Sequence, residues 1–387
     1  METNGEISRK RIILYLLLMV PLIKPDAISQ WPSLVKLESI YSLMRVVSLL
    51  LIGILIIREC RTFKLTLYPV MVFASITTLM VSTFLHGQNV GLYVVGTWLS
   101  IAIATIVIEE GVQRNPTELL IAILMIMSSL LFINLVFLLL NPPSADADSL
   151  HVFLGQKNSV RNYAIPAVTI AFILSKRSRL YFYAGIAVAM ASIFSQVISY
   201  SATGVVTTLL LLVICLNPFL IRRVSGWLLA LIPAFMNLII SIFQIPILNE
   251  LVQSLLNKEA SFTGRDSIWR ASIQCIKTSP YIGLGSGDKS LSRIVSSAAN
   301  TSHNALLDIT YQGGLIAFLS YASLYLISFY QLVKNRLSDE YPYLLSGLLL
   351  FLISGVFENL NYFGFFLLVQ LAYHVADLGQ SNERGKE

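Results

Sequence analysis

The sequence predicts an all-α, polytopic integral membrane protein, and two observations lead to this class. Hydrophobic residues make up 56% of the 387 residues and charged residues only 12%, with a mean hydropathy of +0.73. This balance is far more apolar than that of a soluble domain. About a dozen apolar stretches also follow one another along the chain, each near the roughly 20 residues that a helix needs to cross a membrane. We therefore expect one membrane domain over residues 1–387.

Short polar breaks divide the chain into about 12 predicted transmembrane helices. The stretch at 9–23 resembles a signal peptide but lacks a small-x-small cleavage site, so it is predicted to be an uncleaved first span. The three cysteines show no metal-ligand spacing, and neither a metal nor a cofactor is expected. The predicted spans are 12–28, 37–57, 66–85, 89–108, 118–140, 160–175, 180–199, 203–217, 226–246, 304–333, 342–358 and 361–376.

The distribution of Lys and Arg residues predicts the orientation. With both termini in the cytoplasm, the cytoplasmic connections collect most of these residues, whereas the short outer connections hold Lys24, Lys36, Lys157 and Arg161. The formal charge of +6 thus follows membrane topology and does not indicate nucleic acid. A long loop, 247–303, between the ninth and tenth spans then lies outside the cytoplasm, where no ATP is available.

The long loop contains a predicted helix over about 264–278. Thr263 to Asp266 have the spacing of a capping box, and Ser279-Pro280 is a stop signal. Arg265 falls on the same face of this helix as Ile268, Trp269, Ile273 and Ile276, whereas Arg270 projects to its flank. An Arg on an apolar face needs an anionic partner. That partner is either a carboxylate (Asp266, Asp288 or Glu259) or a phosphate bound near the helix N-terminus.

His303 precedes Asn304 where the loop returns to the membrane. One interpretation is a polar cap at the start of a span. The other is a general base, because imidazole titrates near neutral pH and accepts a proton from a sugar hydroxyl. Asp308 lies five residues on, about 140° around a helix, and is badly placed to orient His303.

The glycine tract from Gly283 to Ser290 nearly matches a phosphate-binding loop, GxxxxGK[ST]. Asp288 occupies the position of the required final glycine, no strand precedes the tract, and the tract is predicted to lie outside the cytoplasm. We therefore predict a flexible turn and no nucleotide site.

Three further sites contain charged residues near the membrane. Lys157 and Arg161, at the outer edge of the sixth span, either snorkel to lipid headgroups or bind an anionic substrate. Glu358, at the outer end of the eleventh span, either orients a base or caps a helix. Arg45 lies inside the second span, where it faces the bundle or snorkels.

These motifs together resemble the O-antigen ligase and Wzy-type polymerase superfamily of bacterial envelope glycan assembly. The resemblance rests on TGRDSIW, SPYIGLGSG and SHNALLDITYQGGL in their order, and more loosely on GQKNSVRNYA and SATGVVTTLL. It implies glycosyl transfer without a metal, outside the cytoplasm, from a polyprenyl-diphosphate-linked glycan to an acceptor sugar hydroxyl. The family's loop Arg corresponds to Arg265 and its loop-end His to His303. A further family Arg is absent from the segment 199–204, which contains SYSATG, and Gln312 replaces an acidic residue often found after the His-Asn pair.

We expect a polymerase of a surface polysaccharide (O-antigen, capsule or exopolysaccharide) in the bacterial cytoplasmic membrane. His303 would deprotonate the acceptor, Arg265 would stabilise the leaving diphosphate, and Arg161, Lys157, Arg270 and Glu358 would contact the substrate. Membrane lipid, a flippase and a chain-length regulator are the expected partners. Two alternatives stay open: a ligase that transfers a finished glycan to lipid or protein, and a flippase or transporter. Transporters often show inverted or parallel repeats and interrupted helices, whereas this sequence shows no repeat and its predicted spans hold few ionisable residues.

Overall fold

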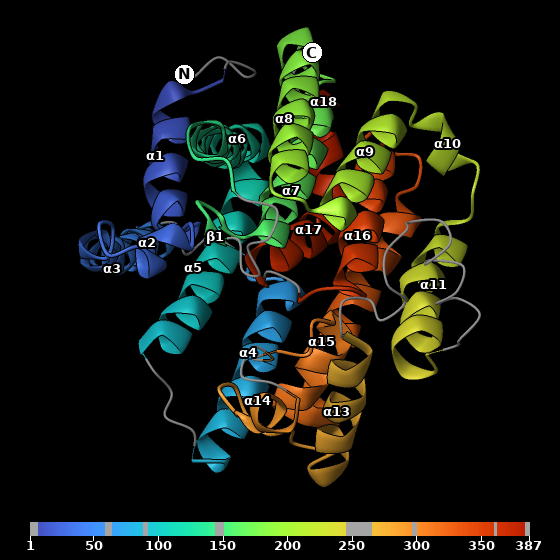
Figure 1. Cartoon of the computed structure of the whole chain (residues 1–387). Helices are drawn as coiled ribbons and strands as arrows, with labels where there is room; N and C mark the ends of the chain where they lie inside the picture. The colour runs from blue at the N-terminus through green and yellow to red at the C-terminus, as the bar shows by residue number, and fades with distance from the viewer. Residues whose placement is uncertain are drawn as a thin grey trace.

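The computed structural model is a bundle of helices with one short β-hairpin (Figure 1). It describes residues 7–58, 64–87, 92–143, 151–244, 265–295, 299, 301–359 and 362–383. A helix overlaps each interval predicted to span the membrane, which agrees with the all-α class. Within these described ranges, five helices are long and apolar enough to cross a membrane: Lys36–Leu55, Leu67–Leu85, Pro116–Leu140, Arg179–Ile198 and Ala305–Lys334.

The first half of the chain forms the helices on one side of the bundle and the hairpin. Helix α1 runs into the 3-10 helix η1, and the short α2 precedes the peripheral α3. The hairpin of β1 and β2 is antiparallel, with His151 opposite Gln156, and leads through η2 into α7. The bounds are α1 Arg9–Met19, η1 Val20–Leu22, α2 Ala27–Gln30, α3 Lys36–Arg58, α4 Leu67–Leu85, α5 Leu92–Arg114, α6 Pro116–Leu140, β1 His151–Val152, β2 Gly155–Gln156 and η2 Lys157–Ser159.

The second half supplies the buried centre and the helices of the long loop. Helix α11 continues into the π-helix η3, and α13 and α14 lie within the interval predicted as the long loop. The bounds are α7 Val160–Leu174, α8 Arg179–Ile198, α9 Ala202–Leu216, α10 Phe219–Arg222, α11 Gly226–Met236, η3 Asn237–Ile242, α13 Arg265–Thr278, α14 Ser290–Ile294, α15 Ala305–Lys334, α16 Tyr341–Gly355, α17 Tyr362–Tyr373 and α18 Val375–Glu383.

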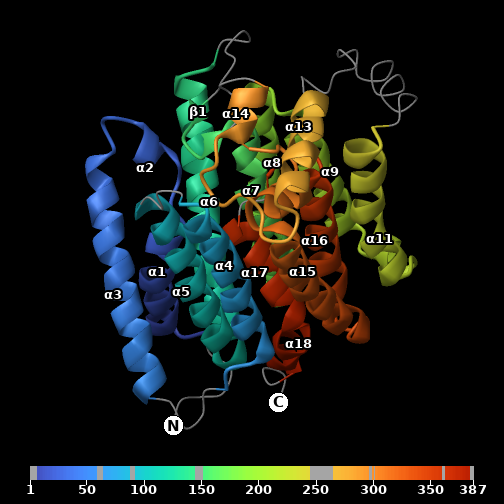
Figure 2. The same ribbon diagram turned by 90° about the horizontal axis from the view of Figure 1, so that it is seen from below.

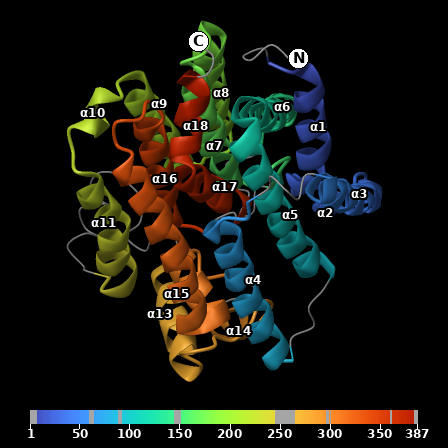
Figure 3. The same ribbon diagram turned by 180° about the vertical axis from the view of Figure 1, so that it is seen from behind.

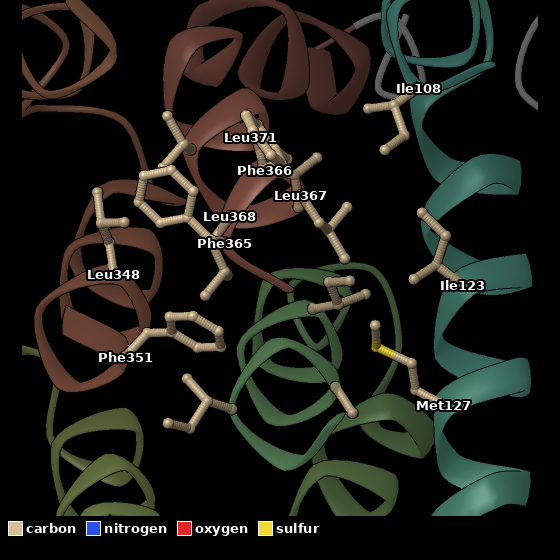
Figure 4. Packing of buried hydrophobic residues seen from close by; sticks show 14 of the residues in the cluster. Ile108, Ile123, Met127, Leu348, Phe351, Phe365, Phe366, Leu367, Leu368 and Leu371 are labelled. Atoms are coloured by element: carbon tan, nitrogen blue, oxygen red, sulfur yellow. The ribbon is translucent and has the colours of Figure 1, made fainter. Parts of the chain in front are cut away.

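Helix α7 lies in the centre of the bundle. Almost all of its residues are buried, and it packs against α6, α8, α9 and α16. Side chains from α5, α6, α16 and α17, such as Ile108, Met127, Phe351 and Leu367, close around it (Figure 4). A helix that is apolar on all sides belongs in the interior of such a bundle. This burial fixes the position of the first turn of α7, which reaches the cavity described below.

The two ends of the bundle differ. Helices α13 and α14 and the hairpin lie towards one end, and α18 lies at the other (Figure 2). The start of α1 is at the α18 end as well, because Ser8 N donates to Glu118 at the start of α6 (3.2 Å). His374, just before α18, contacts Glu109 near the end of α5 at 2.9 Å. The first and last described helices therefore begin and end on the same side of the bundle.

The predicted helix over 264–278 is confirmed as α13, which ends directly before Ser279-Pro280. The predicted capping residues Thr263 and Gly264 lie outside the described residues. The buried face of α13 contains Trp269, Ser272 and Cys275, whereas Ile273 is only half-buried. The buried face is therefore rotated from the predicted one, because α13 packs on α15 (Figure 3).

The glycine tract is part of the packed structure rather than a free turn. Leu284 N donates to Tyr311 O and Gly285 N donates to Gln312 O, each at 2.8 Å, while Leu315 N donates to Pro280 O at 2.8 Å. These bonds are available because α15 is kinked at Gly314 (φ 65°, ψ −164°). The tract forms turns, as predicted, but these bonds tie it to α15, because the kink leaves backbone groups that the loop pairs.

Candidate functional site

A cavity of about 420 Å³ opens among the elements that precede α7, follow α16 and connect α1 to α3. Polar and charged side chains dominate its wall, and they come from segments far apart in the sequence. The lining residues are Leu22, Ile23, Lys24, Asp26, Arg45, Thr97, Ser100, Ile101, Gln156, Asn158, Ser159, Arg161, Asn162, Tyr163, Thr301, His303, Glu358, Asn359 and Phe363.

Glu358 is the residue that several polar and charged side chains at this cavity contact in common. It lies three residues beyond the end of α16, and its side chain is 8% exposed. One carboxylate oxygen, Oε1, accepts hydrogen bonds from Arg265 and from Asn158, and Oε2 contacts His303 Nδ1 at 3.2 Å. Burial alone raises the pKa of Glu358, but the hydrogen bond from His303 and the charges of Arg265 and Arg161 outweigh it and hold the pKa below its usual value. Glu358 is therefore ionised at neutral pH.

His303 is held with one ring nitrogen towards this carboxylate. A neutral imidazole that bonds a carboxylate through Nδ1 carries its proton there, so Nε2 keeps the free lone pair. The side chain is 25% exposed and lines the cavity. Its backbone has a φ of 45°, in the left-handed region that is uncommon for a residue other than glycine. Such a conformation persists only where the surroundings enforce it.

Asn304 holds the backbone at His303 in this conformation through its own hydrogen bonds. It also caps the helix, the role considered for His303. Its Oδ1 accepts from Leu307 N at 2.9 Å, which caps α15. Its Nδ2 lies within 2.8 Å of Asn237 Oδ1, Ser241 Oγ and the carbonyl oxygen of Val356. The fully buried amide thus connects the start of α15 to η3 and to the chain two residues before Glu358.

Arg161 is buried, with 2% of its surface exposed, in the first turn of α7. This burial rules out the predicted alternative in which Arg161 snorkels to lipid headgroups. Its Nε and Nη1 have no hydrogen-bond partner among the described residues. Its charge interacts favourably with Glu358 and unfavourably with Arg265. Burying a guanidinium that has unused donors costs roughly several kcal/mol, unless an anion binds to it.

Arg265 begins α13 and pairs with Glu358, not with the carboxylates considered from the sequence. Asp266, one of those candidates, instead binds Arg270 one turn along the helix at 2.7 Å. The side chain of Arg265 is 18% exposed, and it stands behind Glu358 rather than in the wall of the cavity. The anionic partner required by its place on α13 is therefore inside the protein.

Two predicted contact residues lie apart from this arrangement. The Arg270 side chain is 65% exposed and paired with Asp266. Lys157 is in η2, next to the cavity in sequence, but is not among the described residues that line it. The structure therefore brings together His303, Arg265, Glu358 and Arg161, and leaves Lys157 and Arg270 outside.

The opposite wall contains charged residues that sequence reasoning did not assign to the site. Lys24 binds Glu38 at 2.6 Å, and Arg45 Nε donates to Pro21 O at 3.2 Å. Arg45 reaches the cavity close to Gly96, where a Cβ would lie 3.0 Å from its guanidinium. The sequence signal for this wall was an Arg within an apolar span, which is costly unless it serves a polar cavity.

Comparison with known families agrees with the sequence resemblance. Residues 185–322 match the O-antigen ligase family model. The match runs from within α8 to within α15 and contains Arg265, Arg270 and His303, whereas Arg161 and Glu358 lie outside it. No curated protein matches the chain. The O-antigen ligase match supports a multi-pass membrane enzyme of the glycosyltransferase type that acts on a lipid-linked glycan.

Proposed function

We propose that this protein polymerises a bacterial surface polysaccharide by moving a glycan from polyprenyl diphosphate to the sugar hydroxyl of another lipid-linked repeat unit. One observation carries the proposal. The buried, incompletely paired Arg161 lines the same cavity as His303, whose Nδ1 is bonded to Glu358. An anion contact and an oriented base in one cavity are the two elements that this reaction needs.

Arg161 would bind the diphosphate of the donor. Its guanidinium belongs to a side chain that lines the cavity and suits an oxygen-rich leaving group, and its burial strengthens a charge interaction that bulk water would screen. As the bond from the anomeric carbon to the diphosphate breaks, the electron pair remains on the lipid diphosphate. Negative charge on the leaving oxygen is already growing in the transition state, so Arg161 stabilises that state more than the bound donor.

His303 would remove the proton of the acceptor hydroxyl. The hydroxyl oxygen forms a bond to the anomeric carbon of the donor while its proton passes to Nε2 of His303. The negative charge of Glu358 at Nδ1 compensates the imidazolium that forms. A single displacement of this kind inverts the anomeric carbon.

Arg265 acts through Glu358 in this mechanism. It fixes the carboxylate from behind and adds positive charge near Arg161. Since the diphosphate linkage is already activated, the reaction takes no energy from a nucleotide. We place the cavity on the extracytoplasmic side of the cytoplasmic membrane, where a flippase would deliver the donor and a chain-length regulator would act on the product.

A ligase would use the same residues with another acceptor, and a flippase would move the same lipid without chemistry. The test is to incubate the purified protein, without nucleotide or added metal, with its lipid-linked repeat unit and to follow product length on a gel. A ladder of products supports the polymerase. Transfer only to an added lipid or protein acceptor would instead establish the ligase, and the absence of both reactions would favour the transporter.

Variants of the same assay test the residues. His303→Asn is expected to abolish the ladder, and Arg161→Gln to lower the rate at least about a hundredfold. Asn is chosen because it is one of the few residues besides glycine that adopt positive φ readily. Arg270→Gln is the matched control, because this exposed cation lies outside the cavity, and it should keep the wild-type rate. A full ladder from His303→Asn would remove the proposed base.

A further inference from the structure

Two asparagines stand beside the charged residues of the cavity with unused hydrogen-bonding capacity. Asn162 follows Arg161 in the first turn of α7, and Asn359 follows Glu358. Both line the cavity. The Oδ1 atom of each amide is buried, and neither has a hydrogen-bond partner among the described residues.

Leaving a buried acceptor unpaired is unfavourable, so these two positions require a donor that the described protein does not supply. Other parts of the two side chains line the cavity, and because the terminal torsion of Asn is broad and roughly two-fold, a ligand could turn each amide so that Oδ1 faces the cavity. There a ligand hydroxyl or amide N–H would satisfy it. Neutral amides and hydroxyls also make up much of the remaining wall, including Thr97, Ser100, Gln156 and Thr301.

We propose that Asn162 and Asn359 form a subsite for the first sugar attached to the donor diphosphate and read its hydroxyl or acetamido groups. This inference rests on the proposed function, because it takes Arg161 as the diphosphate contact. Each asparagine is the chain neighbour of a charged residue of the site, so the amides lie next to the point where the diphosphate would bind. The group adjacent to a diphosphate in a lipid-linked glycan is its first sugar.

The experiment compares probes with and without a sugar. Binding to the purified full-length protein is measured for farnesyl diphosphate and for a panel of farnesyl diphosphates that carry glucose, galactose, N-acetylglucosamine or N-acetylgalactosamine. We expect at least one sugar to tighten binding by about three- to tenfold per hydrogen bond gained. Asn162→Ala and Asn359→Ala should each reduce that gain and leave the affinity for bare farnesyl diphosphate unchanged.

The bare diphosphate is also the folding control, because a variant that binds it normally has an intact cavity. Asn217→Ala, at an exposed position after α9, is the matched substitution and should retain the full gain. Equal binding of all probes by the wild type, or a full gain in both cavity variants, would overturn the sugar subsite. Failure of the wild type to bind any farnesyl diphosphate would instead overturn the donor site of the proposed function.

Discussion

At the scale of single residues, Glu358 connects groups that come from three other parts of the chain. Asn158, Arg265 and His303 all bond its carboxylate. A carboxylate that bonds several donors contributes more to stability than any one of the pairs would, because its removal leaves each donor unpaired in a buried setting. The two roles considered for Glu358 from the sequence were to orient a base and to cap a helix, and the contacts favour the first.

Replacing Glu358 by Gln should separate geometry from charge. The amide keeps the shape but cannot accept from three donors while providing a negative charge, so we expect the polymerisation rate to fall about a hundredfold through misplacement of His303. The protein should still accumulate in the membrane. The rate is measured with the gel assay described above, and a wild-type rate would show that His303 does not need this partner.

The same residue predicts an acid dependence of stability. Since the folded-state pKa of Glu358 is below the usual value of 4.5, its ionised form stabilises the fold above that pH, and this contribution is lost as the pH falls below 4.5. The unfolding temperature of the wild type should therefore drop more steeply than that of Glu358→Gln as the pH is lowered through this range. Parallel curves for the two proteins would contradict the assignment.

At the scale of elements, the kink in α15 explains why the sequence needs a glycine both at position 283, in the glycine tract, and at position 314. A Cβ on Gly314 would lie 2.3 Å from the carbonyl of Tyr281, and one on Gly283 would lie 2.5 Å from the backbone of Gln312. The two segments therefore approach each other through backbone atoms alone. This close backbone contact holds α13 and α14 against α15. It thereby keeps Arg265, at the start of α13, near Glu358.

Gly314→Ala should disrupt this backbone contact. The substitution combines a Gly-favoured backbone conformation with a backbone clash, and we expect a loss of about 3 kcal/mol or more of folding stability. Gly53→Ala in α3 is the control, because no atom lies within 4 Å of its added Cβ and the helix tolerates alanine. Thermal unfolding in detergent compares the two, and equal unfolding temperatures would show that the kink is not a fixed feature.

Sequence reasoning located α13 and the helices of the bundle, because apolar periodicity and stop signals are local. It also selected His303 and Arg265 from their places in the chain. It did not identify Glu358 as their common partner, since the bonds join residues 55 and 93 positions apart and no local pattern encodes such a pair. The burial of Arg161 was equally hidden, because a first turn at a membrane edge and a first turn at an internal cavity have the same sequence signature.

At the scale of the whole molecule, the helices that lead to the cavity are too short to cross the full thickness of a membrane. Helices α7 and α16 have 15 residues each, and α17 has 12. At 1.5 Å per residue, 15 residues extend about 22 Å, less than the hydrocarbon thickness of roughly 30 Å. Arg161 lies at the start of α7 and Glu358 beyond the end of α16, where these short helices leave space. A recessed site of this kind would let a lipid tail remain in the membrane while its headgroup reaches Arg161.

The charge distribution of the sequence predicts an extracytoplasmic position for the cavity, and this prediction can be measured directly. Helix α13, which carries the exposed Lys277, lies towards one end of the bundle, and α18 lies at the other (Figure 2). The connection between α15 and α16, which contains the exposed Arg336, lies next to α18, because a Cβ on Gly379 would lie 3.5 Å from the carboxylate of Glu340. In a chain whose native cysteines are replaced, Lys277→Cys should react with a membrane-impermeant maleimide on intact cells, and Arg336→Cys only after permeabilisation. The opposite pattern would place the cavity on the cytoplasmic side, where lipid-linked donors are assembled. The proposed polymerisation would then take place before export, so this labelling experiment tests the order of the two steps as well as the topology.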